Sequence, residues 1–305
     1  MKVGVAGAGA VGCHYGAMLQ RAGHDVAFLA RGAHLAAMRE HGLVHETGGQ
    51  TFSMPVRASD DAGMLADAGC VLLTCKMTAL ATMLDALKDR LSPDALLVTL
   101  QNGVQAPDMV ADAFPQHGVI AGSAFIGVRI EAPGQVVHSA AGHVRLGTWR
   151  ASGYLPCFSA LLQAMKQAGI EAYHDRDMHC TLWNKMLWNC GFNAITALTR
   201  RYARDIAADP ASGEIVRAAM RETLAVAASE GISPDDADIE KNIRATLAAG
   251  PVRTSMWQDI ERGRPTEIDY LNGYIAREAA EKGMTAPVNT MLAALIRVAE
   301  GRSVD

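Results

Sequence analysis

The chain has 305 residues, of which half are apolar and 20% are charged, and this composition excludes a disordered or fibrous protein. The net charge of −4 argues against a nucleic-acid-binding protein, which usually carries a basic surplus. At about 150 residues per domain, the length predicts two domains.

The first half of the chain alternates short apolar runs with helical stretches, as a doubly wound α/β sheet does. Strands are expected at residues 2–6, 25–30, 70–76 and 95–100, a hairpin at 43–57, and helices at 10–22 and 79–91. The stretches 119–130 and 136–147 also have the alternating pattern of strands. A helix at 155–168 and a short strand at 170–173 are expected to complete this part.

From residue 175 onward the pattern is helical. Helices are expected at residues 176–196, 211–230, 234–249, 256–262, 267–282 and 287–300. Gly231 and Gly283 suit helix ends, and Pro234 and Pro287 suit first helical turns. We therefore predict a Rossmann-like domain over residues 1–173 and an all-helical domain over 174–305, with a ligand-binding cleft between them.

Residues 7–12 have the GxGxxG pattern of a dinucleotide-binding turn. The pattern follows an expected strand and opens an expected helix, which is the context that the motif requires. Gly7 would make the tight turn, Gly9 would let the backbone approach a pyrophosphate, and Gly12 would let helix and strand pack closely. Free N–H groups at the helix start would bind the phosphates. The predicted cofactor-binding residues of this turn are Gly7, Ala8, Gly9, Ala10, Val11 and Gly12.

The end of the second expected strand indicates which dinucleotide binds. An NAD site usually has an acidic residue there, whereas this chain has Arg31, and Asp25 lies at the opposite end of the strand. A guanidinium can bind a 2′-phosphate through two hydrogen bonds. Arg31 therefore favours NADP(H) as the cofactor, the alternative being a solvated surface arginine.

Two more polar residues follow expected strands, at the sheet edge where open α/β sheets bind ligands. Lys76 ends one apolar run and Asn102 follows another. Taken alone, Lys76 could simply extend into solvent, and Asn102 could belong to an ordinary turn. Because both would face the same crevice as the glycine turn, we expect them to be functional.

A polar stripe runs along an otherwise apolar helix in the second half of the chain. Lys185, Asn189 and Asn193 recur at every fourth position. A narrow solvated face would explain the stripe, but a lysine on a buried helix is rare unless it is paired. The functional interpretation is a cationic, amide-lined seam that faces the cleft. Further along, Thr266 suits a helix N-cap, with Glu267 in the first helical turn.

Together these motifs resemble the ketopantoate reductase (2-dehydropantoate 2-reductase) family over essentially the whole chain. The resemblance rests on residues 7–12, Arg31, Lys76 and residues 100–104, 183–185 and 266–273. It implies an NADP-binding Rossmann-like domain joined to an all-helical domain. It also implies reduction of 2-dehydropantoate, a small anionic keto acid, to pantoate in pantothenate biosynthesis.

The same resemblance implies a role for each site residue. Lys185 would be the general acid and Glu267 its carboxylate partner. The implied substrate-binding residues are Asn102, Asn189, Asn193, Ser255 and Glu267, with Lys76 and Asn102 near the nicotinamide.

The chemistry of these residues agrees with such a reaction. Hydride addition to a ketone leaves negative charge on oxygen, and the Lys185 ammonium can donate a proton to it. A carboxylate such as Glu267 would help to keep that ammonium charged in a closed cleft. Two alternatives stay open: an NADP-dependent reductase of another 2-keto or hydroxy acid, and a non-catalytic NADP-binding redox sensor. The polar stripe disfavours the sensor.

The cysteines and the apolar runs bear on compartment and partners. The six cysteines are scattered without a CxxC pair, so neither a disulfide framework nor a metal site is expected. No apolar run approaches the roughly 20 residues that span a bilayer. We expect a cytoplasmic protein that binds neither nucleic acid nor membrane, with a homodimer left open.

Overall fold

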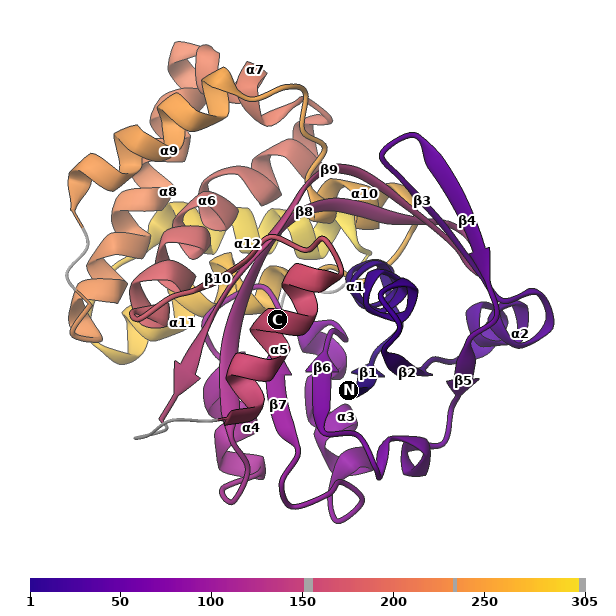
Figure 1. Cartoon of the computed structure of the whole chain (residues 1–305). Coiled ribbons are helices and arrows are strands. Elements are labelled where there is room, and N and C mark those ends of the chain that lie inside the picture. The colour runs from indigo at the N-terminus through magenta and orange to yellow at the C-terminus, as the bar shows by residue number, and fades with distance from the viewer. Residues whose placement is uncertain (151–155, 233–234, 302–305) are drawn as a thin grey trace. The chain divides into compact units, whose positions relative to one another are not determined.

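The computed structural model describes residues 1–150, 156–232 and 235–301, which form two compact units (Figure 1). The first unit comprises residues 1–101 and 105–178, and the second comprises residues 102–104 together with the chain from residue 179. The change of unit at residue 178 falls after the expected boundary at 173. The first unit extends past residue 173 because residues 172–174 pair with residues 144–146 of the sheet, and the Asp175 N–H donates to the Leu146 carbonyl over 2.8 Å.

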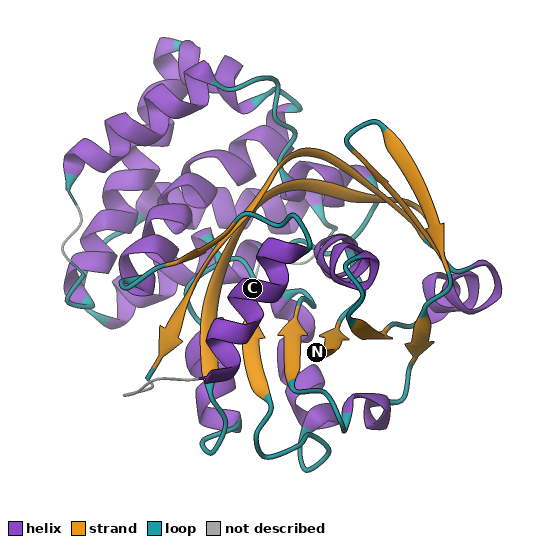
Figure 2. Cartoon of the chain, viewed as in Figure 1, coloured by secondary structure: helices purple, strands orange, loops and turns teal. Residues whose placement is uncertain are grey.

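The first unit is built on a ten-stranded sheet in the order β4-β3-β9-β8-β7-β6-β1-β2-β5, with β10 paired to β9 (Figure 2). The strands are β1 (Lys2–Ala6), β2 (Asp25–Leu29), β3 (Leu43–Thr47), β4 (Gln50–Met54), β5 (Arg57–Ser59), β6 (Cys70–Leu73), β7 (Leu96–Thr99), β8 (Val119–Ala132), β9 (Gln135–Trp149) and β10 (Ala172–His174). The six strands β8, β7, β6, β1, β2 and β5 pair with one another in parallel. On its other side, β8 pairs antiparallel with β9. The chain runs from β1 to β2 and returns to β6 on the other side of β1, so the strand order reverses between β1 and β6.

The helices of the first unit are α1 (Ala10–Arg21), α2 (Gly32–His41), α3 (Leu80–Leu87), α4 (Ala106–Ala113) and α5 (Pro156–Gln167), with short 3₁₀ turns at Ala62–Leu65 and Met77–Ala79. Helix α1 contacts β1 and β2 and also β3, β8 and β9, and the long strands β8 and β9 curve over it (Figure 1). Gly16 permits this close packing, since a Cβ there would lie 2.4 Å from the Phe28 ring. The predicted α/β fold class is confirmed. The hairpin expected at 43–57 is observed over residues 43–54, and Arg57 instead begins β5, which pairs with β2.

Two helices of this unit were not expected from the sequence. Helix α2 buries only Leu35 and Met38, so its apolar periodicity is too weak to stand out. Helix α4 has only eight residues and therefore barely two turns of pattern. The expected helix at 155–168 is observed from Pro156, and Leu155 lies outside the described residues.

All regular secondary structure in the described residues of the second unit is helical. Its helices are α6 (Met178–Thr199, whose first residue belongs to the first unit), α7 (Ala203–Ala208), α8 (Pro210–Ser229), α9 (Asp236–Ala248), α10 (Ser255–Glu261), α11 (Asn272–Glu281) and α12 (Pro287–Ala299), with a 3₁₀ turn η3 (Ile268–Tyr270). Helices α6 and α8 approach closely at Gly191, where a Cβ would lie 2.6 Å from the end of the Met220 side chain. Gly231 and Gly283 follow helix ends with positive φ, and Pro287 opens α12, as predicted. Pro234 lies outside the described residues.

The predicted helix over 267–282 is wrong at its start. The segment begins with the 3₁₀ turn η3, and α11 starts only at Asn272. Leu271 has φ −115° and ψ −106°, which interrupts helical geometry between the two. The Thr266 hydroxyl accepts the Ile268 N–H over 3.2 Å, so it caps the short turn and not an α-helix. Glu267 therefore lies just before η3, outside any α-helix.

Candidate active site

The glycine turn between β1 and α1 has the geometry of a phosphate cradle. Gly7 has φ +105°, and a Cβ there would lie 2.5 Å from the Cys75 backbone nitrogen. A Cβ on Gly12 would lie 2.4 Å from the Thr74 hydroxyl oxygen and 2.6 Å from the Gly7 carbonyl oxygen. A Cβ on Gly9 would meet no described atom within 4 Å. The outer glycines are thus required by packing, whereas Gly9 leaves open space above the turn.

This turn also leaves the start of α1 suited to an anion. Gly9 is the N-cap of α1, and no side chain caps the helix. The first N–H groups of a helix have no partner within the helix, and the helix dipole favours negative charge there. The reversal of strand order between β1 and β6 places this turn where open α/β sheets bind ligands. The residues present therefore fit the pyrophosphate of a dinucleotide.

Arg31 lies two residues after the end of β2 and is the exposed N-cap residue of α2. No side chain caps α2, and its first turn has no acidic residue. Asp25 lies at the other end of β2, where it pairs with Arg57 over 2.7 Å. The carboxyl end of β2 thus presents a guanidinium where NAD sites usually have a carboxylate. Lys76 follows β6 on the same edge of the sheet, as the half-buried residue before a 3₁₀ turn.

In the second unit, the two amides of the α6 polar stripe are buried, and Lys185 is half-buried. Asn189 and Asn193 are only 4% and 1% exposed. The Asn193 amide donates to Asn189 Oδ1 over 3.2 Å. This bond leaves Asn189 Nδ2 as a donor and Asn193 Oδ1 as an acceptor, both without a partner among the described residues. An unsatisfied buried polar atom costs about 1–3 kcal/mol, so this pair is suited to a ligand that carries both an acceptor and a donor.

Lys185 and Glu267 are the charged residues of the candidate site in this unit. Burial lowers the pKa of Lys185 to about 8, and the Glu267 carboxylate acts in the opposite direction. Glu267 is 9% exposed and accepts a hydrogen bond from Asn102 Nδ2 over 3.2 Å. The structure therefore brings Lys185, Glu267 and Asn102 together from three separate parts of the sequence, and the two amides follow Lys185 along α6 at every fourth position.

Ser255 is placed by contacts that the sequence did not reveal. It is exposed as the first residue of α10, and its neighbour Thr254 is the buried N-cap that accepts the Trp257 N–H over 3.2 Å. The hydroxyls of Thr254 and Thr196 lie 2.8 Å apart. Since the Thr196 hydroxyl also lies 2.8 Å from the Phe192 carbonyl, which can only accept, Thr254 is the donor to Thr196. This bond ties the start of α10 to α6.

A second buried network holds the segment that carries Glu267. Asn272 is fully buried, and its amide donates to the Cys190 carbonyl and to Asn289 Oδ1, both over 2.9 Å. Asn289 in turn donates to Glu222 over 2.7 Å. Four helices are therefore joined through side-chain amides next to the site. In the sequence, Asn272 could have indicated this network, but an asparagine near the start of a helix is usually interpreted as an ordinary cap.

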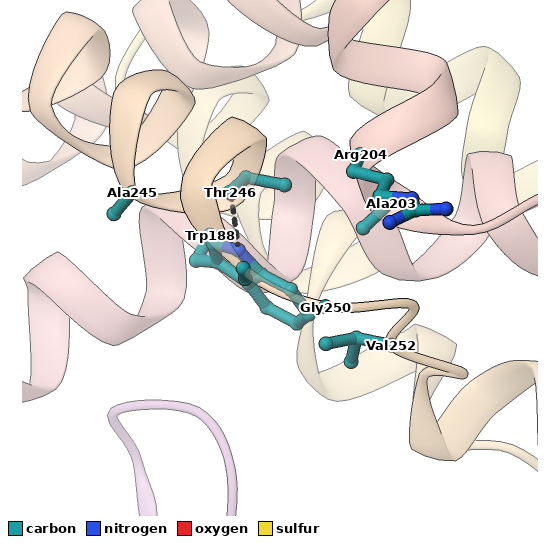
Figure 3. A pocket seen from close by; sticks show the side chains of 8 residues that line it. Trp188, Ala203, Arg204, Ala245, Thr246, Gly250 and Val252 are labelled. Atoms are coloured by element: carbon teal, nitrogen blue, oxygen red, sulfur yellow. Dashed lines mark hydrogen bonds between the residues drawn. The ribbon is translucent and has the colours of Figure 1, made fainter.

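One cavity of the second unit, drawn in Figure 3, does not include these residues. It measures about 130 Å³ and lies between α6, α7, α9 and the segment after α9. It is largely apolar, and the Trp188 indole N–H donates to the Thr246 hydroxyl over 3.0 Å at its wall. Ligand pockets usually measure about 300–1,000 Å³, so we do not assign the substrate to it.

Other classes of site find no support in the part of the chain that the structure describes. No group of three histidine, cysteine or acidic side chains there is arranged to hold a metal ion. None of the helices in that part combines the length and apolarity needed to span a bilayer.

Comparison with known proteins gives a consistent picture. Residues 3–151 match the family described as ketopantoate reductase PanE/ApbA, and residues 177–300 match its C-terminal part. A 2-dehydropantoate 2-reductase of Mesorhizobium japonicum is 31% identical over 319 aligned positions, which cover 97% of each chain. A PanE/ApbA family ketopantoate reductase from Ralstonia eutropha JMP134 has a similar structure, with a TM-score of 0.90, 33% identity and 99% coverage of both chains. D-mandelate dehydrogenase in a ternary structure with NADH and anilino(oxo)acetate has a TM-score of 0.92, 25% identity and the same coverage.

The Rossmann-like unit with its glycine turn, and the similarity over nearly the whole chain to curated 2-dehydropantoate 2-reductases, identify an NAD(P)-dependent oxidoreductase. The chain belongs to the ketopantoate reductase family.

Proposed function

We propose that the protein reduces 2-dehydropantoate to pantoate with NADPH. The observation that carries this proposal is the buried amide pair of α6, which leaves one donor and one acceptor unused on the helix that also carries Lys185. 2-Dehydropantoate has a hydroxyl group that could serve both, because a hydroxyl accepts from an amide N–H and donates to an amide oxygen. A simple keto acid without the hydroxyl would leave Asn193 Oδ1 unsatisfied.

NADPH would be held by the glycine turn of residues 7–12, by the start of α1 and by Arg31, with Lys76 and Asn102 toward the nicotinamide. When bound, it supplies the hydride that reduces the ketone carbon. Lys185 would donate the proton that the carbonyl oxygen takes up as its negative charge develops. Glu267 would keep Lys185 protonated, and Asn102 would hold the Glu267 carboxylate in place through the bond described above.

The substrate can be tested with a panel of 2-keto acids, following NADPH oxidation by absorbance. The matched pair is 2-dehydropantoate and 3,3-dimethyl-2-oxobutyrate, which differ only by the hydroxyl. We expect kcat/KM to be at least roughly tenfold higher for 2-dehydropantoate, from the cost of a polar group left unpaired. Asn193→Leu should remove most of this preference. Equal kcat/KM values for the two acids in the wild-type protein would contradict the proposal.

A second candidate is an aromatic 2-keto acid, favoured by the similarity to D-mandelate dehydrogenase. Benzoylformate belongs in the same panel for this reason. Turnover of benzoylformate above that of 2-dehydropantoate would select the second candidate. No turnover of any keto acid by a protein that binds NADPH would favour the non-catalytic sensor. A cytoplasmic location and a homodimer stay predictions.

A further inference from the structure

His34 joins three segments of the first unit that are far apart in the sequence. It lies in the first turn of α2, and its Nδ1 accepts the Gly134 N–H of the turn between β8 and β9 over 3.0 Å. Its Nε2 lies 3.4 Å from the Cys13 thiol of α1. The Cys13 thiol lies 3.4 Å from the carbonyl of Ala8, within the glycine turn.

The direction of each hydrogen bond in this series is fixed by the groups at its two ends, the Gly134 N–H and the Ala8 carbonyl. A backbone N–H can only donate, so His34 Nδ1 is an acceptor and, in the neutral ring, Nε2 carries the proton. Burial raises the pKa of Cys13 to about 12, so the thiol keeps its proton and donates it to the Ala8 carbonyl. Hydrogen bonds therefore run in one direction, from Gly134 through His34 and Cys13 to the glycine turn.

The first turn of α2 has few other constraints. No side chain caps it, and its first hydrogen bond, from the Leu35 N–H to the Arg31 carbonyl, is long at 3.4 Å. Gly32, the residue after Arg31, has φ +61°, a conformation that glycine adopts at little cost, and it has no side chain that could hold the turn. Gly134 also rests on α2, since a Cβ there would lie 3.1 Å from the Ala37 Cβ. The imidazole of His34 thus anchors the turn that begins at Arg31 through hydrogen bonds, next to the buried side chain of Leu35.

We propose that His34 is a positioning residue for cofactor selectivity, which holds Arg31 at the 2′-phosphate by fastening the start of α2 to Cys13 and to the β8–β9 turn. This inference rests on the proposed function, in which Arg31 binds the 2′-phosphate. Through Cys13, the same link connects the 2′-phosphate end of the cofactor site to the turn that would bind the pyrophosphate. Loss of His34 should therefore weaken NADPH binding more than NADH binding, because only NADPH uses Arg31 in this way.

The test is to titrate NADPH and NADH into the whole protein and to compare the two dissociation constants. For His34→Ala we expect the NADPH constant to rise roughly five- to tenfold and the NADH constant less than twofold, the scale of one or two lost hydrogen bonds. Cys13→Ala should act in the same direction but less strongly. Cys13→Ser, which replaces the thiol with a hydroxyl that can still donate and accept, should recover part of the NADPH binding that Cys13→Ala loses. His41→Ala is the matched control, because His41 is an exposed histidine at the other end of α2.

Arg31→Ala completes the experiment. In that background, His34→Ala should no longer change NADPH binding more than NADH binding. If Arg31→Ala lowers NADPH preference but His34→Ala and Cys13→Ala weaken both cofactors equally or not at all, the inference is overturned while the proposed cofactor stands. If the wild-type protein binds NADPH and NADH equally, the proposed cofactor fails and the inference fails with it. Should His34→Ala not fold, Cys13→Ala decides between the same outcomes.

Discussion

At the scale of single residues, the proposed chemistry depends on a lysine whose surroundings act on it in two directions. Burial favours the neutral amine of Lys185, and the Glu267 carboxylate favours the ammonium. The resulting pKa of about 8 leaves the group mostly protonated near neutral pH and able to donate a proton. A lysine in water, with a pKa near 10.4, would be a weaker acid.

This balance predicts the pH dependence of the reaction. For keto-acid reduction, kcat/KM should fall as pH rises through about 8, because Lys185 must be protonated to act as the acid. Glu267→Gln should move this fall to lower pH, since the carboxylate raises the pKa of Lys185 and its removal lowers it. Lys185→Ala should lower kcat by roughly 10²–10⁴ and abolish the fall. A Lys185→Ala protein with the wild-type pH profile would reject Lys185 as the donor.

Arg31 gives a second prediction at this scale. Arg31→Ala should weaken NADPH binding by about 1.5–3 kcal/mol, the scale of hydrogen bonds to a charged group, and NADH binding much less. Calorimetric titration of both cofactors into wild-type and variant protein measures this difference. An unchanged NADPH constant in the variant would mean that Arg31 is only a solvated surface residue.

At the scale of elements, packing requires some glycines of the turn between β1 and α1 but not the others. Gly7 and Gly12 are surrounded by backbone and side-chain atoms at distances that exclude a Cβ, whereas Gly9 is not. Gly9 also has φ −79°, which other residues adopt readily. Neither packing against the described residues nor the backbone conformation therefore requires a glycine at position 9. A ligand bound in the space above the turn would explain why this residue has no side chain.

Two alanine variants test this difference. Gly9→Ala should change the free energy of unfolding by no more than about 0.5 kcal/mol while weakening both cofactors, because its methyl group would occupy the space for the pyrophosphate. Gly12→Ala should destabilise the protein by about 1–3 kcal/mol, as overpacking does. Denaturant unfolding and cofactor titration of both variants measure the two effects. Unchanged cofactor binding by Gly9→Ala would argue that the space above the turn is not a binding site.

At the scale of the whole molecule, acid should destabilise the protein through buried histidines. His14 on α1 and His45 on β3 are almost fully buried, and their rings are joined over 3.0 Å between Nδ1 and Nε2. Burial, with smaller effects of His138 and His45, lowers the pKa of His14 to about 3, and burial lowers that of His45 to about 4. Both stay neutral when folded at pH 5, whereas in the unfolded chain both would be protonated below about pH 6.5.

Because the unfolded chain binds more protons, stability must fall as pH falls below about 6.5. Between pH 7 and pH 5 we expect a loss of about 2 kcal/mol from His14, with a further loss from His45. Denaturant unfolding at the two pH values measures the total. The double variant His14→Phe/His45→Leu should show a smaller difference between the two pH values, and the exposed His41→Ala should keep the wild-type difference.

The sequence by itself determined the features that depend on local spacing. The alternation of strands and helices, the glycine turn with its three distinct roles, and the i, i+4, i+8 stripe on α6 all follow from short-range geometry, and the structure contains each of them. Helix ends at Gly231 and Gly283 are of the same kind, because a positive φ suits glycine wherever the chain places it.

Only the tertiary structure decided which distant groups meet. Asn102 and Glu267 are 165 residues apart in the sequence, yet they share a hydrogen bond. The start of α11 at Asn272 depends on buried amide bonds to Cys190 and Asn289, which outweigh the local signal for a helix from Glu267. The same holds for the link from Gly134 through His34 to Cys13. Local sequence cannot specify such contacts, because they form only when packing has buried both partners and left each with a hydrogen bond to satisfy.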